Sequence, residues 1–157
     1  MFSVQPIAFV HNERMEITDD EWGEVRSLIT LSESFTEESI QGIEEFSHIE
    51  VIFYFHKVTD VQIQYSARHP RNNSNYPKVG VFVQRGKNRP NRIGATIVNV
   101  IRREGKTIVV EGLDAIDGTP ILDIKPVMKE FIPREEIKQP DWATDIMKQY
   151  WKGNEVK

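Results

Sequence analysis

The sequence predicts a mainly β domain, an antiparallel barrel or a sandwich, with a short helix after the second strand and a C-terminal helix. Three observations predict this class. Apolar and polar residues alternate over several short stretches, as in half-buried strands. Turn-forming residues separate these stretches. The chain has 157 residues, the size of one domain, so we expect residues 1–157 to form a single domain.

The first third of the chain predicts three strands and one helix. Residues 24–31 alternate Val25, Ser27, Ile29 and Leu31 on one face, as a half-buried strand does. Thr36 opens a Thr-Glu-Glu-Ser run, in which a hydroxyl precedes acidic residues, and this is typical of a helix start. Elements are expected at 5–10 (strand), 24–31 (strand), 36–46 (short helix) and 49–58 (buried strand).

The remaining elements are read from the same signals. Glu104 and Gly105 stand between two apolar runs and indicate a hairpin turn. Asp141 is expected to cap the C-terminal helix. The expected elements are strands at 61–68, 79–84, 93–102, 106–113 and 121–125, loops at 70–77, 86–92 and 114–119, and a helix at 142–151.

The chain contains no cysteine, which excludes disulfides, thiolate metal sites and a cysteine nucleophile. Residues 1–10 lack the basic and long apolar regions of a signal peptide. The longest apolar run, at 51–55, is too short to span a bilayer. We therefore expect a cytoplasmic protein without a membrane partner.

The charge is distributed unevenly along the chain, although the net value is only −4. Residues 1–60 carry 13 acidic and 3 basic side chains. Residues 61–103 carry 9 Lys and Arg side chains and no Asp or Glu. This stretch is a candidate anion-binding surface on an otherwise acidic protein.

Several common sites are excluded by their motifs. No Gly-x-Gly occurs, so a Rossmann-type methyltransferase or dehydrogenase is not expected. Gly86-Lys87-Asn88 lacks the upstream glycine and the Ser or Thr of a phosphate-binding P-loop. The four histidines show no metal-binding pair at helical spacing, and we expect no metal.

Three segments resemble signatures of the TsaA-like (tRNA methyltransferase O) family. Residues 42–49 (GIEEFSHI) lead into 53–56 (FYFH), and residues 80–85 (GVFVQR) are followed by 89–94 (RPNRIG). The third segment, 112–126 (GLDAIDGTPILDIKP), is the most specific because of its length. Their order and spacing are similar to the family's over about residues 42–127.

This resemblance implies a small antiparallel β-barrel, often a homodimer, that binds S-adenosylmethionine without a Rossmann domain. It also implies methylation of the N6 atom of threonylcarbamoyladenosine in tRNA. The positions that match the family's cofactor contacts are His56, Lys57, Arg85, Ala95, Glu111, Gly112, Leu113 and Asp114.

Two further groups of residues are interpreted by their chemistry. Methyl transfer to an exocyclic amine requires the loss of one proton, and Asp114 and Asp117 are candidate catalytic carboxylates. The alternative for both is turn formation, for which Asp is well suited. The basic loop is a candidate site for RNA phosphates, with Lys87, Arg89, Asn91 and Arg92 as substrate-binding residues. The alternative is a solvated basic loop.

The loop at 84–94 departs from the family's Thr-Arg-Ser-Pro-Phe-Arg-Pro-Asn-Pro-Ile-Gly pattern. Gln84, Gly86 and Arg92 stand in place of threonine, serine and proline. The leading hypothesis is a tRNA methyltransferase, and the departures suggest a divergent paralogue. The departures motivate two alternatives: a non-catalytic module that binds S-adenosylmethionine or RNA, and a small-molecule methyltransferase.

Overall fold

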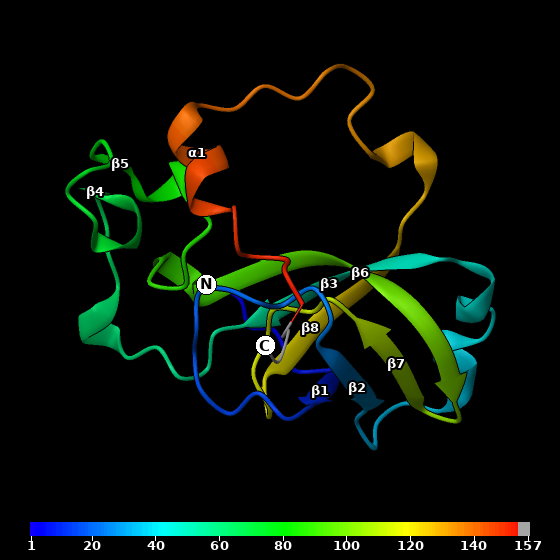
Figure 1. The fold of residues 1–157 in the computed structure, drawn as a ribbon. Helices are drawn as coiled ribbons and strands as arrows, with labels where there is room; N and C mark the ends of the chain where they lie inside the picture. The colour runs from blue at the N-terminus through cyan, green and yellow to red at the C-terminus, as the bar shows by residue number, and fades with distance from the viewer. Residues whose placement is uncertain (154–157) are drawn as a thin grey trace.

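A closed antiparallel barrel forms the centre of the molecule. The structure is a computed structural model and describes residues 1–153. Going round the barrel, the strands follow the order β1-β2-β7-β6-β3-β8 (Figure 1). Their bounds are β1 Ala8–His11, β2 Arg26–Leu31, β7 Thr107–Glu111, β6 Ile93–Glu104, β3 His48–Tyr54 and β8 Pro120–Pro126. The predicted mainly β class is confirmed, and the barrel rather than the sandwich is the architecture.

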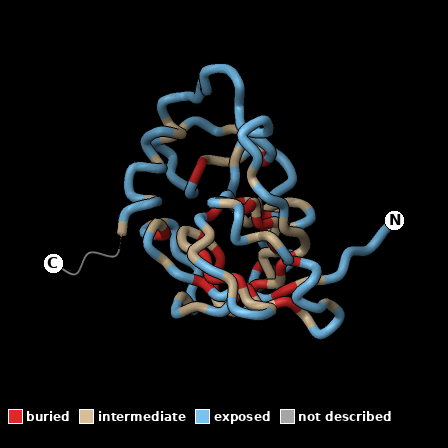
Figure 2. Tube along the Cα trace, turned by 90° about the vertical axis from the view of Figure 1, so that its right-hand side faces the viewer, coloured by how far each residue is buried: buried red, intermediate tan, exposed pale blue. Residues whose placement is uncertain are grey.

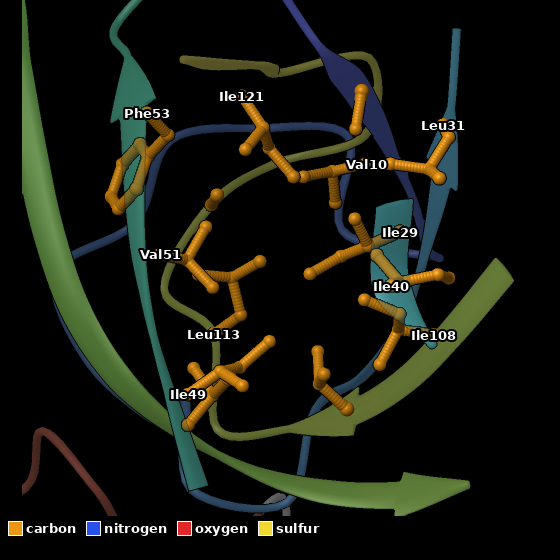
Figure 3. Packing of buried hydrophobic residues seen from close by; sticks show 14 residues of the cluster. Val10, Ile29, Leu31, Ile40, Ile49, Val51, Phe53, Ile108, Leu113 and Ile121 are labelled. Atoms are coloured by element: carbon orange, nitrogen blue, oxygen red, sulfur yellow. The ribbon is translucent and has the colours of Figure 1, made fainter. Parts of the chain in front are cut away.

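Alternating apolar side chains fill the barrel, as period-two patterning requires. On β2 the buried residues are Ser27, Ile29 and Leu31, as the alternation predicts. Figure 3 shows Ile29 and side chains from the other strands pointing toward one another across the interior. Figure 2 shows that buried positions concentrate in this part of the molecule.

The predicted short helix at 36–46 consists of two 3₁₀ turns, η1 (Glu37–Ile40) and η2 (Ile43–Glu45). Gly42 separates them with φ = +90°, a left-handed conformation that ends a helix. The Thr36 side chain makes no capping hydrogen bond. The Thr-Glu-Glu-Ser run therefore marks a helical start correctly, but Gly42 prevents the continuous helix.

Two predicted strands are largely wrong, because they lie in a small lobe outside the barrel. Residues 61–68 contain η3 (Asp60–Gln62) and only the two-residue β4 (Ala67–Arg68). Residues 79–84 contain β5 (Val79–Gly80) and η5 (Val81–Val83). β4 and β5 pair only with each other. Val61 is 91% exposed, so the apolar pattern here has no sheet face to pack against. Two further 3₁₀ turns are η4 (Pro70–Asn72) and η6 (Pro90–Arg92).

The C-terminal helix is shorter than predicted. α1 spans Asp141–Ile146, and Pro140 rather than Asp141 occupies its N-cap. An exposed segment at 127–140, containing η7 (Lys129–Phe131), leads from β8 to α1 and arcs away from the barrel (Figure 1). After α1 the chain returns to the barrel, where Trp22 N donates to the Tyr150 carbonyl over 2.8 Å. The helix thus leads the chain back to the barrel, where Tyr150 lies.

Candidate functional site

One rim of the barrel gathers most of the predicted site residues. The strand register places Arg26 opposite Glu111 and Tyr54 opposite Ile93. Because neighbouring strands are antiparallel, every second strand ends at this rim and the others begin there. The strand ends concerned are His11, Arg26, Tyr54, Ile93, Glu111 and Pro120. Residues that follow or precede these ends, such as 56–57 and 112–119, therefore lie at the same rim although they are far apart in sequence.

Arg85 and Ala95 lie together in a hollow of about 340 Å³ beside the start of β6. The Arg85 Nη2 atom donates to the Ala95 carbonyl over 2.5 Å. The lining comprises residues 82–85, Arg89 and residues 93–95. Arg85 and Ala95, which the family resemblance assigns to the cofactor, thus share one hollow with Arg89, which the chemistry of the basic loop assigns to the substrate.

Gly94 lies in the wall of this hollow, and two aromatic rings pack against it. A Cβ on Gly94 would lie 2.6 Å from the Phe53 ring and 2.9 Å from the Phe55 ring. The two rings pack edge to face, with centroids 5.3 Å apart. Only glycine lets the two rings approach the β6 backbone this closely. At this point the backbone alone separates the barrel core from the hollow.

Asp114 is held by two hydroxyl groups. Thr96 Oγ1 donates to Asp114 Oδ1 over 2.5 Å, and the Tyr150 hydroxyl donates to the other carboxylate oxygen. Burial first, and then the Asp114 carboxylate, raise the pKa of Tyr150 well above its ordinary value. Tyr150 therefore stays protonated as a donor at neutral pH.

The residues that precede Asp114 in the sequence make contacts elsewhere in the protein. Glu111 pairs with Arg26 over 3.2 Å, and Leu113 is completely buried among the core side chains (Figure 3). Gly112 adopts φ = +89°, and its N–H donates to the Val25 carbonyl over 3.0 Å. Within the predicted stretch at 111–114, only the Asp114 side chain contacts Thr96 and Tyr150.

His56 and Asp117 lie on the loops at the same rim. Burial, and secondarily the charge of Lys57, lower the pKa of His56. A Cβ on Gly118 would come within 3.8 Å of His56 Nε2. Asp117 Oδ1 accepts the backbone N–H of Asn12 over 3.0 Å. The geometry of Asp117 thus favours the turn-forming alternative over proton transfer.

Part of the predicted substrate loop, residues 87–92, makes hydrogen bonds within the protein. Arg92 Nη1 donates to the Tyr54 hydroxyl and to the Val58 carbonyl, each over 2.9 Å. Arg89 Nη1 donates to the Gln84 carbonyl over 2.7 Å. Asn91 forms the turn with φ = +66°. Lys87 makes no salt bridge or side-chain hydrogen bond with the residues that the structure describes. The four residues lie close in sequence, but Arg89 and Arg92 already serve the fold.

Three residues of the rim were not predicted from the sequence. Thr96 and Tyr150 bind Asp114, and the Asn12 amide donates to Ser27 Oγ and the Ala115 carbonyl. Tyr150 carried no usable signal, since its partner is 36 positions away.

The described residues offer neither a cluster of metal ligands nor a membrane-spanning helix. Within residues 1–153, no three His, Cys, Asp or Glu side chains come together as a metal site. Over the same residues, no helix has the length and apolar character needed to cross a bilayer.

The comparisons with known proteins agree with the geometry. The family model described as the tRNA-methyltransferase O N-terminal domain matches residues 8–131. A tRNA (adenine(37)-N6)-methyltransferase of Homo sapiens is 39% identical over 104 residues, 66% of this chain but only 23% of that protein. A probable S-adenosyl-L-methionine-binding protein of Pyrococcus abyssi is 33% identical over 143 residues, 88% of this chain and 74% of that protein.

A solved structure of TrmO from P. aeruginosa superposes with a TM-score of 0.72 at 27% identity. It covers 89% of this chain, whereas this chain covers 61% of the solved one. The match of the family model extends over more than half of the chain, and the resemblance inferred from the three sequence segments is confirmed. The chain therefore belongs to the family defined by the N-terminal domain of tRNA-methyltransferase O.

Proposed function

We propose that the chain binds S-adenosylmethionine at the barrel rim and transfers its methyl group to tRNA. The acceptor we propose is the N6 atom of threonylcarbamoyladenosine. The observation that carries the proposal is the convergence of Arg85, Ala95 and Asp114 at one rim. Relatives named as tRNA (adenine(37)-N6)-methyltransferases support the same reaction.

The chemistry of the rim fits this cofactor. The Arg85 guanidinium suits a carboxylate, with which arginine forms charge-assisted bonds. The Asp114 carboxylate suits hydroxyl or amino donors, which Thr96 and Tyr150 supply at present. Gly94 lets the Phe53 ring pack directly against the β6 backbone that lines the hollow. We assign Arg85, Ala95, Asp114 and the backbone of 111–113 to the cofactor, with His56 and Lys57 at the margin of the site.

The protein's own contribution is orientation and proton removal. When bound, the cofactor supplies an activated methyl group on a sulfonium sulfur. The residues of the rim then position the acceptor amine and exclude water, which is where an enzyme without a strong nucleophile gains its rate. Asp114 is the carboxylate we assign to accepting the amine proton or orienting the amine. Asp117 remains the second candidate, but its bond to Asn12 N assigns it first to holding a turn.

Calorimetry with S-adenosylmethionine tests the cofactor directly. Arg85→Ala should weaken binding, whereas Arg102→Ala should not, because Arg102 pairs with Glu104 at the far end of β6. Absence of binding by the wild-type protein at millimolar cofactor would refute the proposal.

Methyl transfer is tested separately, with labelled cofactor, unfractionated tRNA and excess protein. Label in tRNA is expected. Cofactor binding without transfer would instead support the non-catalytic binding module, and label confined to metabolites would support a small-molecule methyltransferase.

We also propose that two copies associate as a homodimer and that the protein acts in the cytoplasm. The exposed segment at 127–140 supports association, since Phe131 is 85% exposed, Ile137 69% and Ile132 46%. Sedimentation analysis is the test. A monomer at micromolar concentration would refute the dimer without affecting the cofactor proposal.

A further inference from the structure

The chain that follows α1 runs back to the barrel (Figure 1) and is fixed there by its backbone. Trp22 N donates to the Tyr150 carbonyl over 2.8 Å. A Cβ on Gly23 would lie 1.8 Å from the Trp151 carbonyl oxygen, so the two segments are in direct contact and only glycine leaves room for it. We call residues 147–153 the C-terminal strap.

Tyr150 extends from this strap to the carboxylate of Asp114, in the loop after β7. The Tyr150 hydroxyl donates to Asp114 Oδ2, and Thr96 Oγ1 on β6 donates to Oδ1 over 2.5 Å. Each oxygen of the carboxylate has its own donor, so rotation of the carboxylate plane would weaken both bonds. A carboxylate offers about four acceptor positions. Asp114 is only partly buried, and it can therefore still accept hydrogen bonds from a ligand.

Arg85 lies within electrostatic reach of the same phenol. Burial first, and then the Asp114 carboxylate, raise the pKa of Tyr150. The charge of Arg85 acts on this pKa in the opposite direction and more weakly. Tyr150 is therefore close to both of the charged side chains that we assign to the cofactor, and as a protonated phenol it is a constant donor.

We propose that Tyr150 is a positioning residue, which holds the Asp114 carboxylate in the orientation that the ligand requires, so that the C-terminal strap completes the site. The strap lies beyond residues 8–131, which the family model matches. A carboxylate that is already held does not have to be ordered when the ligand binds, and such ordering costs affinity. The inference rests on the proposed function in taking Asp114 as a ligand-binding residue.

The test removes the Tyr150 hydroxyl and measures cofactor affinity by calorimetry and methyl transfer to tRNA at saturating cofactor. Tyr150→Phe is expected to lower the affinity, the transfer rate or both about 2- to 12-fold, the cost of ordering one side chain on binding. Tyr76→Phe is the matched control, because the Tyr76 hydroxyl also donates to a carboxylate, that of Asp145 in α1. This variant also loosens the C-terminal part of the chain but does not touch Asp114, so affinity and rate should stay at the wild-type values.

A double-mutant cycle shows whether the effect passes through Asp114. In the Asp114→Ala background, Tyr150→Phe should cause little further loss, because the carboxylate that it positions is gone. A strap that only stabilised the fold would cause the same loss in both backgrounds, and that result would overturn the inference. If Asp114→Ala abolishes binding or folding, the comparison of Tyr150→Phe with Tyr76→Phe decides alone. Tighter cofactor binding by Tyr150→Phe would also overturn the inference, since the strap would then obstruct the site.

The inference and the proposed function fail in different ways. Cofactor affinity and transfer rate that are the same in Tyr150→Phe, Tyr76→Phe and the wild type would refute the role of Tyr150 and sustain the reaction. Absence of cofactor binding by the wild-type protein would refute the proposed function, and the positioning role of Tyr150 with it.

Discussion

Replacing Gly94 by alanine should destabilise the barrel where its core meets the candidate site. The added Cβ would lie 2.6 and 2.7 Å from two Phe53 ring atoms, whereas carbon atoms in contact are about 3.5–4 Å apart. The ring must therefore move by about 1 Å. Phe53 is 2% exposed, and β3 is hydrogen-bonded on both sides by β6 and β8. Neither the ring nor the strand has free space, and overpacking of this kind costs about 1–3 kcal/mol.

Urea unfolding followed by tryptophan fluorescence measures this cost. With a slope of about 2 kcal/mol per molar, a loss of about 2 kcal/mol lowers the midpoint by about 1 M. Gly86→Ala is the matched control, because nothing lies within 4 Å of its added Cβ. Its stability should be unchanged or slightly raised, since alanine restricts the unfolded chain. Equal midpoints for the two variants would refute the reasoning.

Phe53→Leu provides a second check on the same collision. Alone it removes buried volume and should destabilise the protein. In the Gly94→Ala background it also removes the ring that the new methyl group meets, so the two losses should be less than additive. Additive losses would mean that the ring is not what resists the Cβ.

Three further predictions concern other contacts. Tyr150→Phe removes the hydroxyl that binds Asp114 and should cost about 1–3 kcal/mol of stability. The Trp22 amide proton, which donates to the Tyr150 carbonyl, should exchange faster because the chain around Tyr150 is released. Unchanged exchange would contradict this prediction. Burial and Lys57 lower the pKa of His56 from 6.5, so the unfolded chain binds the proton first as pH falls. The free energy of unfolding should therefore decrease below about pH 6.5, and it should decrease less in His56→Gln. The same dependence of the unfolding free energy on pH in both proteins would contradict this prediction. Arg92→Ala removes hydrogen bonds to Tyr54 and Val58 and should cost about 2 kcal/mol, which lowers the melting temperature by about 4–8 °C. Lys87→Ala should leave the melting temperature unchanged but weaken RNA binding. Equal melting temperatures for the two variants would mean that Arg92 does not stabilise the fold.

The barrel strands were predictable because their sequences carry a period-two pattern. The alternation along residues 24–31 matches the buried face of β2, and the hairpin of β6 and β7 turns at Gly105, with φ = +60°. The lobe was not predictable in the same way. Residues 61–68 and 79–84 have strand-like composition, but propensity operates only where a sheet offers a face to pack on.

The candidate site divides along similar lines. Arg85 and Ala95 were inferred from a motif, and the structure places them in contact. Asp114 was inferred too, but its partner Tyr150 was not, because that contact joins the loop after β7 to the chain after α1. Arg92, which is predicted to bind phosphate, also donates to the Tyr54 hydroxyl and the Val58 carbonyl. Which arginines remain available to a ligand depends on side-chain partners that a linear pattern does not contain.

By itself, the sequence determined that this is a mainly β chain with a basic middle stretch and no Rossmann glycine motif. It also determined the family, because the segment at 112–126 is long enough to be specific. Only the tertiary structure decided that the barrel is closed, that Gly94 thins the wall beside Phe53, and that Tyr150 returns to Asp114. The physical reason is that local patterning is set by near neighbours, whereas closure, close approach and side-chain pairing depend on residues brought together from distant parts of the chain.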